Sequence, residues 1–332
     1  MSSKQVESKI DNSPVVVSFC TGQAVRLRIT SESKSNLLCE DVMTWTKTHV
    51  ETLGMRKDVG VHEILWGDSD DVEYIYNYDK EELCIGVNFT AIHDALTAAS
   101  PIDTVCIYAT KKSLSARRPY IYVKVFNKDN CYEYLRKVCT IMLKKNPNAK
   151  KMRKAEQVVS MSSSLLQKVL RNGARTGELC QFYSHKYKDG SGSYLIIRVI
   201  GDNGSLIFRQ KYQTQEPGVY KEETYPLQYM NPIAKQTNLS PEVSLHLLRN
   251  SCIGVEYRIG TIGKVMYTLE PSSTINSMFD LGDKPTTKTN IGETPKISKF
   301  KRPVSRRKRR VSANQPLAKT SAKQMKLTDM KK

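Results

Sequence analysis

Runs of β-branched and alternating apolar residues recur along most of this chain, and they constrain its fold more than any other feature. Turn signals such as Lys188-Asp-Gly-Ser-Gly and Gly201-Asp-Asn-Gly separate the runs. Alternation with a period of two is typical of strands that pack one face on a core. After an apolar run at 15–19, we expect strands at 24–30, 72–78, 104–108, 120–126, 194–200 and 205–212.

Helices are expected to be few and short. One is predicted at 35–46, where Ser35 and Asn36 are possible capping residues, and another begins at Asn88. A third begins at Ser162 and stops at a glycine, with apolar side chains at 165, 166, 169 and 170. A fourth is expected at 227–236, although Pro232 interrupts it.

The order of these elements repeats, because each half reads strand, helix, strands, helix, strands. This order predicts an α+β protein with an internal duplication of architecture. Residues 137–157 combine a short apolar patch at 139–143 with a basic run, and we interpret them as a linker across a surface. The expected boundaries are a disordered arm at 1–14, domains at 15–136 and 158–279, a connector at 137–157 and a disordered tail at 280–332.

The formal net charge of +19 over 332 residues lies mostly in the tail. Residues 291–332 hold 14 Lys and Arg against Glu293 and Asp329, which gives +12 and leaves +7 for residues 1–290. A moderately basic body suits sequence-independent contact with phosphates. The tail has the composition of a nuclear import signal that also binds polyanions. The cations assigned to this import signal are Lys301, Arg302, Arg306, Arg307, Lys308, Arg309 and Arg310.

Catalytic and cofactor motifs are missing from the sequence. It contains no phosphate-binding glycine loop, nucleophile elbow or H-E-x-x-H zinc motif, so we expect no enzyme, cofactor or metal site. The eight cysteines show no C-x-x-C spacing, which favours buried reduced thiols. The acidic stretch at 68–71 is interpreted as a solvated turn. The start has no apolar signal region and no stretch reaches membrane-spanning length, so we expect an intracellular protein.

The third predicted helix carries a one-sided stripe of cations. Lys168, Arg171 and Arg175 follow helical spacing opposite the apolar positions. An ordinary solvated face is the alternative, but such faces usually mix both signs of charge and this one holds no Asp or Glu. The stripe therefore favours contact with phosphates.

The segment Gly254-Val-Glu-Tyr-Arg-Ile-Gly-Thr-Ile-Gly-Lys-Val-Met-Tyr-Thr-Leu-Glu-Pro resembles the closing strands of the eukaryotic sliding clamps, the proliferating cell nuclear antigen family. Leu227-Gln-Tyr-Met-Asn with Lys235, Cys84-Ile-Gly-Val-Asn-Phe-Thr and Val158-Val-Ser-Met-Ser-Ser are also similar to that family. The resemblance covers residues 84–275 well and 17–83 poorly. The departures and the added tail are typical of a divergent member, such as one from a large DNA virus.

The resemblance implies a non-catalytic processivity factor that tethers a replicative DNA polymerase and other clamp-binding proteins to duplex DNA in the nucleus. It implies two domains with curved sheets outside, four helices facing a central hole, and usually three subunits in a closed ring. Asp94 and Thr97 stand where the family has lysines, so contact is expected to depend on the second domain. The residues that match the family's DNA-facing cations are Lys128, Lys168, Arg171, Arg175 and Lys235.

Subunits of the family join through edge strands, and partner peptides bind a pocket near the connector and the last strand. Thr268 and Glu270 replace an aromatic and a small residue there, which predicts a different choice of peptides. The matching edge residues are Tyr132, Tyr134, Leu206 and Phe208. The alternative interpretation is that their strands only pair within a sheet of the same subunit. The matching pocket residues are Ile141, Met142, Leu143, Thr268, Leu269 and Pro271.

Three other functions remain open at the level of sequence. One is a monomeric or dimeric accessory subunit that grips DNA without encircling it. Another is a subunit of a checkpoint clamp. The third is a basic chromatin- or RNA-associated protein whose body only resembles a clamp.

Overall fold

The computed structural model describes residues 13–56, 58–127, 129, 132–143, 155–186, 192–202, 204–212, 223–248 and 252–271. All of them belong to one compact unit that comprises residues 1–283. The fold is α+β with mostly antiparallel strands, which confirms the expected class. Most of the expected arm, the tail from 280 with its import signal, and Lys128 lie outside the described residues.

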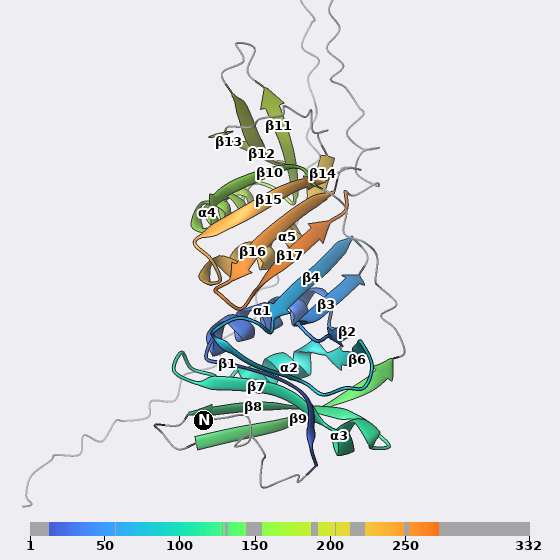
Figure 1. The fold of residues 1–332 in the computed structure, drawn as a ribbon. Coiled ribbons are helices and arrows are strands. Elements are labelled where there is room, and N and C mark those ends of the chain that lie inside the picture. The colour runs from blue at the N-terminus through green and yellow to red at the C-terminus, as the bar shows by residue number, and fades with distance from the viewer. Residues whose placement is uncertain are drawn as a thin grey trace, which may run out of the picture. The chain divides into compact units, whose positions relative to one another are not determined.

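The first part of the chain alternates strands and helices, and its short helix α3 is additional to the predicted order (Figure 1). They are β1 (Val15–Thr21), α1 (Ala24–Leu37), β2 (Glu40–Trp45), β3 (His49–Arg56), β4 (Val59–Trp66), β5 (Val72–Tyr76), β6 (Leu83–Asn88), α2 (Phe89–Leu96), β7 (Thr104–Thr110), α3 (Lys111–Ser115), β8 (Tyr120–Asn127) and β9 (Tyr132–Leu143).

The second part repeats the order of strand, helix, strands, helix and strands. Its elements are β10 (Ala155–Ser162), α4 (Ser163–Gly173), β11 (Leu179–Lys186), β12 (Ser193–Gly201), β13 (Gly204–Tyr212), β14 (Glu223–Pro226), α5 (Leu227–Ala234), the 3-10 helix η2 (Lys235–Asn238), β15 (Glu242–Leu248), β16 (Ile253–Ile259) and β17 (Gly263–Leu269).

Two sheets organise the described strands. The larger has 13 strands in the order β10-β15-β16-β17-β4-β3-β2-β6-β9-β8-β7-β1-β5, and the smaller has the order β13-β12-β11-β14. The larger sheet crosses between the two parts of the chain at β4 and β17, which pair antiparallel from Val59 with Leu269 to Leu65 with Gly263. This pairing joins the two parts by backbone hydrogen bonds as well as by side-chain packing.

The helices pack against one another as well as against the sheets. Helix α1 contacts α2 in the first part, α4 contacts α5 in the second, and α1 also contacts α5 and η2. Leu166, Val169 and Leu170 are buried, as the predicted apolar face of α4 requires. The α1–α5 contact makes a seam between the two parts on the helical side of the large sheet.

The strand predicted at 24–30 and the helix predicted at 35–46 are both wrong. Residues 24–37 form α1, and the chain then continues as strand β2. The alternating letters of 24–30 imitate a strand. The buried face of α1 mixes three small polar side chains and Lys34 with three apolar ones, which weakens the apolar period of a helix. Cys39 ends this region with a positive φ of 64°, so the chain leaves the helix abruptly before β2.

The interpretation of residues 137–143 as part of a surface linker is also wrong. They continue β9, which pairs with β8 as far as Cys139 and then with β6 from Thr140 to Leu143. The basic composition that suggested a linker belongs to residues 144–154, which lie outside the described part of the chain. The remaining predicted strands and the helices beginning at 88, 162 and 227 are confirmed.

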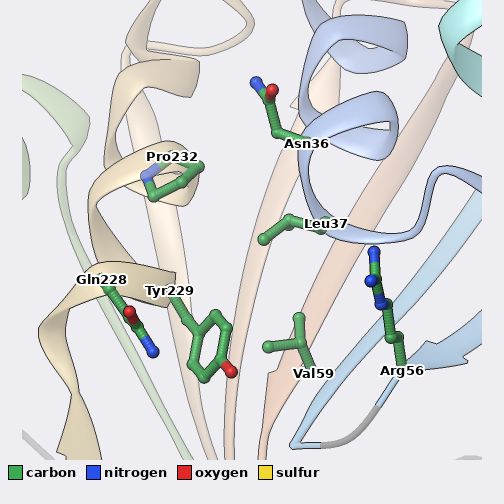
Figure 2. Close-up of a pocket in the computed structure, with 7 residues that line it drawn as sticks. All are labelled: Asn36, Leu37, Arg56, Val59, Gln228, Tyr229 and Pro232. Atoms are coloured by element: carbon green, nitrogen blue, oxygen red, sulfur yellow. The ribbon is translucent and has the colours of Figure 1, made fainter.

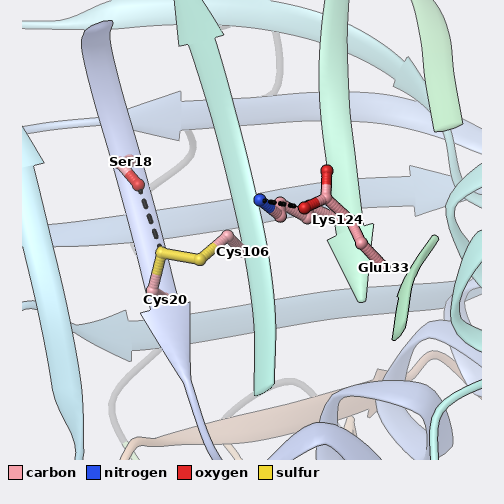
Figure 3. The surroundings of a disulfide bond; sticks show 5 residues. All are labelled: Ser18, Cys20, Cys106, Lys124 and Glu133. Atoms are coloured by element: carbon pink, nitrogen blue, oxygen red, sulfur yellow. Dashed lines mark hydrogen bonds and ion pairs between the residues drawn. A yellow bond between two sulfur atoms is a disulfide. The ribbon is translucent and has the colours of Figure 1, made fainter. Parts of the chain in front are cut away.

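The expectation of reduced thiols fails for one pair of cysteines. Cys20 on β1 lies directly opposite Cys106 on β7, and the two form a disulfide (Figure 3). This pair packs with Tyr108 and Tyr122, whose rings stack with centroids 4.8 Å apart. The other described cysteines, at 39, 84, 139, 180 and 252, take no part in this disulfide. Spacing could not reveal the pair, because 86 residues separate its members.

Candidate nucleic-acid interface

Helix α4 presents the predicted cations to solvent. Lys168 and Arg171 are exposed on the helix, and Arg175 is exposed just after it. The orientation is fixed by the buried apolar face and by Gly173, where an added Cβ would lie 2.5 Å from a methyl carbon of Val199. The helix therefore cannot roll without breaking close contacts with β12. Its exposed side offers charge to an anionic ligand.

A fourth predicted cation lies on the neighbouring helical element. Lys235 is exposed at the start of η2, directly after α5, whose side chains Met230 and Ile233 are buried. Because α4 contacts both α5 and η2, the structure brings Lys235 and the α4 cations onto adjoining elements. Three cations on adjoining helices, together with Arg175 just after α4, make a surface suited to phosphate groups.

The helices of the first part of the chain carry a mixture of charges. Glu32 on α1 and Asp94 on α2 are exposed, and Asp94 forms a half-exposed ion pair with Arg136 at 3.7 Å. Arg28 on α1 donates a hydrogen bond to the carbonyl of Ala99 at 3.0 Å. The alternating pattern of residues 24–30 predicts a strand and therefore hides Arg28 as a helical cation. Of α1, α2, α4 and η2, only α4 and η2 therefore present exposed cations without an exposed carboxylate on the same element.

Lys34 belongs to the core of the protein. Its ammonium forms a buried ion pair with Glu63 of β4 and lies 4.8 Å from the centre of the Phe89 ring. Both members of the pair are almost completely buried. Lys34 therefore stabilises the packing of α1 on the sheet and is not available to a ligand.

The predicted subunit-interface residues lie on two strands with open edges. In the described part of the chain, β13 pairs only with β12, and residues 132–139 of β9 pair only with β8. Tyr132 and Tyr134 are 40% and 41% exposed, whereas Leu206 and Phe208 pack against the core. The side chain between them, Ile207, is 49% exposed. Open backbone edges of this kind accept a further strand.

A buried carboxylate fixes the start of the β9 edge. Burial opposes ionisation of Asp103, but hydrogen bonds from the Tyr132 hydroxyl, the Ser100 backbone and the Asn127 amide lower its pKa to about 2. The Ser100 amide and the Asn127 side chain donate to it at 2.7 and 3.0 Å. Asp103 therefore ties Tyr132 to the loop before β7.

The predicted partner-binding residues do not form one pocket. Strands β4, β3, β2 and β6 lie between β17 and β9 in the sheet, so Ile141, Met142 and Leu143 are remote from Thr268 and Pro271. Leu269 is buried in the core. The error arose because 141–143 were assigned to the connector and are in fact the end of β9.

A row of cross-strand paired residues nevertheless runs across the large sheet from β17 to the end of β9. Paired residues run from Met266 through His62, Leu53, Val42 and Gly86 to Ile141. Thr268 lies on the same face, two residues along β17 from Met266. Ile141 is 69% exposed and borders a groove of about 470 Å³ with Val42 and Gly86. Val42 and Leu53 are not expected at this site from the sequence, since the helix predicted at 35–46 includes Val42.

No protein-family model matches the chain, and no curated protein matches its sequence.

Within the described ranges, no group of three or more His, Cys, Asp and Glu is arranged to hold a metal ion. The helices of those ranges include none with the length and apolar character of a membrane span. The stretch at 68–71 lies in the loop between β4 and β5, where Asp71 accepts hydrogen bonds from Gln23 and Thr261.

Proposed function

We propose that this protein is a polymerase processivity factor of the sliding-clamp type, which holds duplex DNA through sequence-independent phosphate contacts. The observation that carries the proposal is the set of exposed cations on the adjoining elements α4 and η2. Helix α4 bears Lys168 and Arg171 and no Asp or Glu. Long cationic side chains that meet phosphates and read no bases would let the protein bind any sequence and move along it.

The repeated element order supports two similar domains, at 15–136 and 158–279, as in a clamp subunit. In this proposal the connector is shorter than expected, since β9 extends to Leu143. The helices form the DNA side of each domain and the large sheet forms the other side. A homotrimeric ring is the favoured assembly, closed by pairing the open edge of β9, near Tyr134, with the open edge of β13, near Ile207.

Replication enzymes are proposed to dock on the sheet side. In the row from Met266 to Ile141, Ile141 and the partly exposed Leu53 supply apolar side chains on that face, and Met55 beside them is 42% exposed. The basic run from Lys301 to Arg310 is proposed to direct the protein to the nucleus.

Charge reversal tests the DNA contact. We expect Lys168→Glu, Arg171→Glu and Lys235→Glu together to abolish duplex binding in fluorescence anisotropy and to remove the stimulation of polymerase processivity. The matched control is Lys80→Glu, Lys111→Glu and Arg118→Glu, which changes the same charge at exposed residues outside α4, α5 and η2. If both triple variants lose DNA binding equally, the effect is one of net charge and the proposed interface is wrong.

An open accessory subunit that grips DNA without encircling it is the second candidate function. The exposed Glu32 and Asp94 on the first-part helices favour it, because a closed ring would bring these carboxylates toward the phosphates. The two functions differ in their dependence on topology. A closed ring stays on circular DNA and is lost when the circle is cut, whereas an open gripper is retained equally on both. Light scattering then distinguishes a trimer from a monomer or dimer.

A further inference from the structure

A cavity lies at one end of the seam between α1 and α5. It has a volume of about 300 Å³ and is bounded by the end of α1, the end of β3, the start of β4 and helix α5. Figure 2 shows Arg56 near the end of α1 and Gln228 and Tyr229 on α5, with Leu37 and Val59 between them. The cavity therefore has an apolar floor and a polar rim.

The rim offers hydrogen-bond donors without an opposing carboxylate. The seven described residues that line the cavity include the Arg56 guanidinium and the Asn36 and Gln228 amides, but no Asp or Glu. Arg56 uses one Nη1–H group to donate to the Cys39 sulfur at 3.2 Å. A guanidinium has five N–H donors in a planar fork, so this bond orients the group and leaves others for a ligand.

A second cavity continues the first along the same seam. It has a volume of about 280 Å³, shares Asn36 and Pro232 with the first, and is lined by Arg28 and Lys235. Glu32 is the single carboxylate among the described residues that line it. Three cations and one carboxylate thus border these two adjoining cavities, which together make up the seam groove and fit an anionic ligand better than a cationic or apolar one.

We propose that this seam groove binds a phosphate of the nucleic-acid backbone and that Arg56 is its main contact. This inference rests on the proposed function, since Lys235 belongs to both the groove and the α4–η2 surface. It extends the track of phosphate contacts from the second part of the chain across the seam, to a residue at the end of β3. The track ends there and leaves the mixed-charge surface of α2 without a DNA contact.

The salt dependence of duplex binding tests the proposal. Each phosphate contact contributes about 0.9 to the slope of log K against log salt. We expect Arg56→Gln to lower the slope by about one contact and to weaken binding roughly threefold to fivefold at moderate salt. Arg118→Gln removes the same charge from an exposed loop before β8 and should change neither quantity. Arg171→Gln on α4 serves as the positive control for the proposed function.

A second variant keeps the test valid if loss of the Arg56–Cys39 contact disturbs the fold. Asn36→Asp places a carboxylate on the rim that both cavities share and leaves Arg56 in place. We expect the thermal midpoint to be nearly unchanged and duplex affinity to fall at low salt, because the new charge repels phosphate.

The outcomes separate the two proposals. If Arg171→Gln weakens duplex binding while Arg56→Gln and Asn36→Asp behave like Arg118→Gln, the seam inference is wrong and the proposed function stands. If Arg171→Gln also has no effect, the proposed function itself fails. If inorganic phosphate alone binds in calorimetry and requires Arg56, but the duplex salt slope does not change, the groove takes a free anion and the backbone proposal is overturned.

Discussion

The Cys20–Cys106 disulfide should be a large source of stability for the first part of the chain. The bond joins neighbouring strands β1 and β7 across a sequence separation of 86 residues. In the chain-entropy account, a crosslink that closes a loop of this length removes about 15 cal/mol/K from the unfolded state, which is about 4.6 kcal/mol at 25 °C. Natural disulfides that have been removed cost about 2–5 kcal/mol, so the value is at the upper end of that range.

Urea denaturation with and without reductant measures this contribution. Both tryptophans, Trp45 on β2 and Trp66 on β4, lie in the first part of the chain, so their fluorescence reports on the region that the disulfide crosslinks. With a slope of about 3 kcal/mol/M, a loss of about 4.6 kcal/mol lowers the midpoint by about 1.5 M. Mass spectrometry of the oxidised and reduced protein confirms the state of the bond in each sample.

The double variant Cys20→Ala with Cys106→Ala provides the control. It should unfold near the midpoint of the reduced wild type, and reductant should not move it further. A wild-type midpoint that reductant changes by less than about 0.3 M would refute the reasoning, since the loss would then be under about 1 kcal/mol. Equal effects of reductant on the wild type and the double variant would assign the change to other thiols.

Three further substitutions test other contacts, each by urea denaturation. Glu63→Gln leaves the Lys34 charge buried without its partner and should lower the free energy of unfolding by about 3–5 kcal/mol. A loss under about 1 kcal/mol would mean that water reaches the pair. Gly54→Ala should cost about 1–3 kcal/mol, because the added Cβ would lie 1.9 Å from a carboxylate oxygen of Asp41; a neutral result would show that Asp41 moves freely. The pKa of Asp103 falls from 3.8 to about 2 on folding, so the stability that the Asp103 carboxylate gives to the protein is complete above pH 3.8 and is lost as the pH falls toward 2. Asp103→Asn should remove that acid-dependent loss of stability. An unchanged dependence of stability on acid pH would contradict the assignment of the loss to Asp103.

The sequence predicted those parts of the fold whose local pattern agrees with their final environment. The prediction of the buried face of α4 is confirmed, because Leu166, Val169 and Leu170 follow the helical period and are all buried. The class of the fold and most strands are predicted correctly because their apolar and polar residues alternate, and the apolar side chains are the ones buried in the core. These features depend on residues within one turn or one strand, so they are visible without knowledge of the tertiary structure.

The errors occur where distant segments decide the outcome. Helix α1 buries Thr30, Ser31 and Ser33, which a sequence pattern assigns to a surface, because α2 and the sheet cover them. The Cys20–Cys106 pair and the row from Met266 to Ile141 depend on strand register, which hydrogen bonding between remote segments sets. Among the DNA-site residues, Lys168, Arg171, Arg175 and Lys235 are exposed as predicted, whereas their binding of DNA stays a prediction.

The pairing of β4 with β17 has a consequence for synthesis of the chain on the ribosome. Strand β4 ends at Trp66, but its partner opposite Leu65 is Gly263, so roughly 200 residues must be translated before the pair forms, which takes about 10–40 s at typical rates. During that interval the nascent first part presents β4 as an unpaired edge with buried-type side chains such as Val59 and Val61. Nascent chains that stall before residue 263 should therefore recruit chaperones or aggregate, while chains released after Leu269 close their own edge.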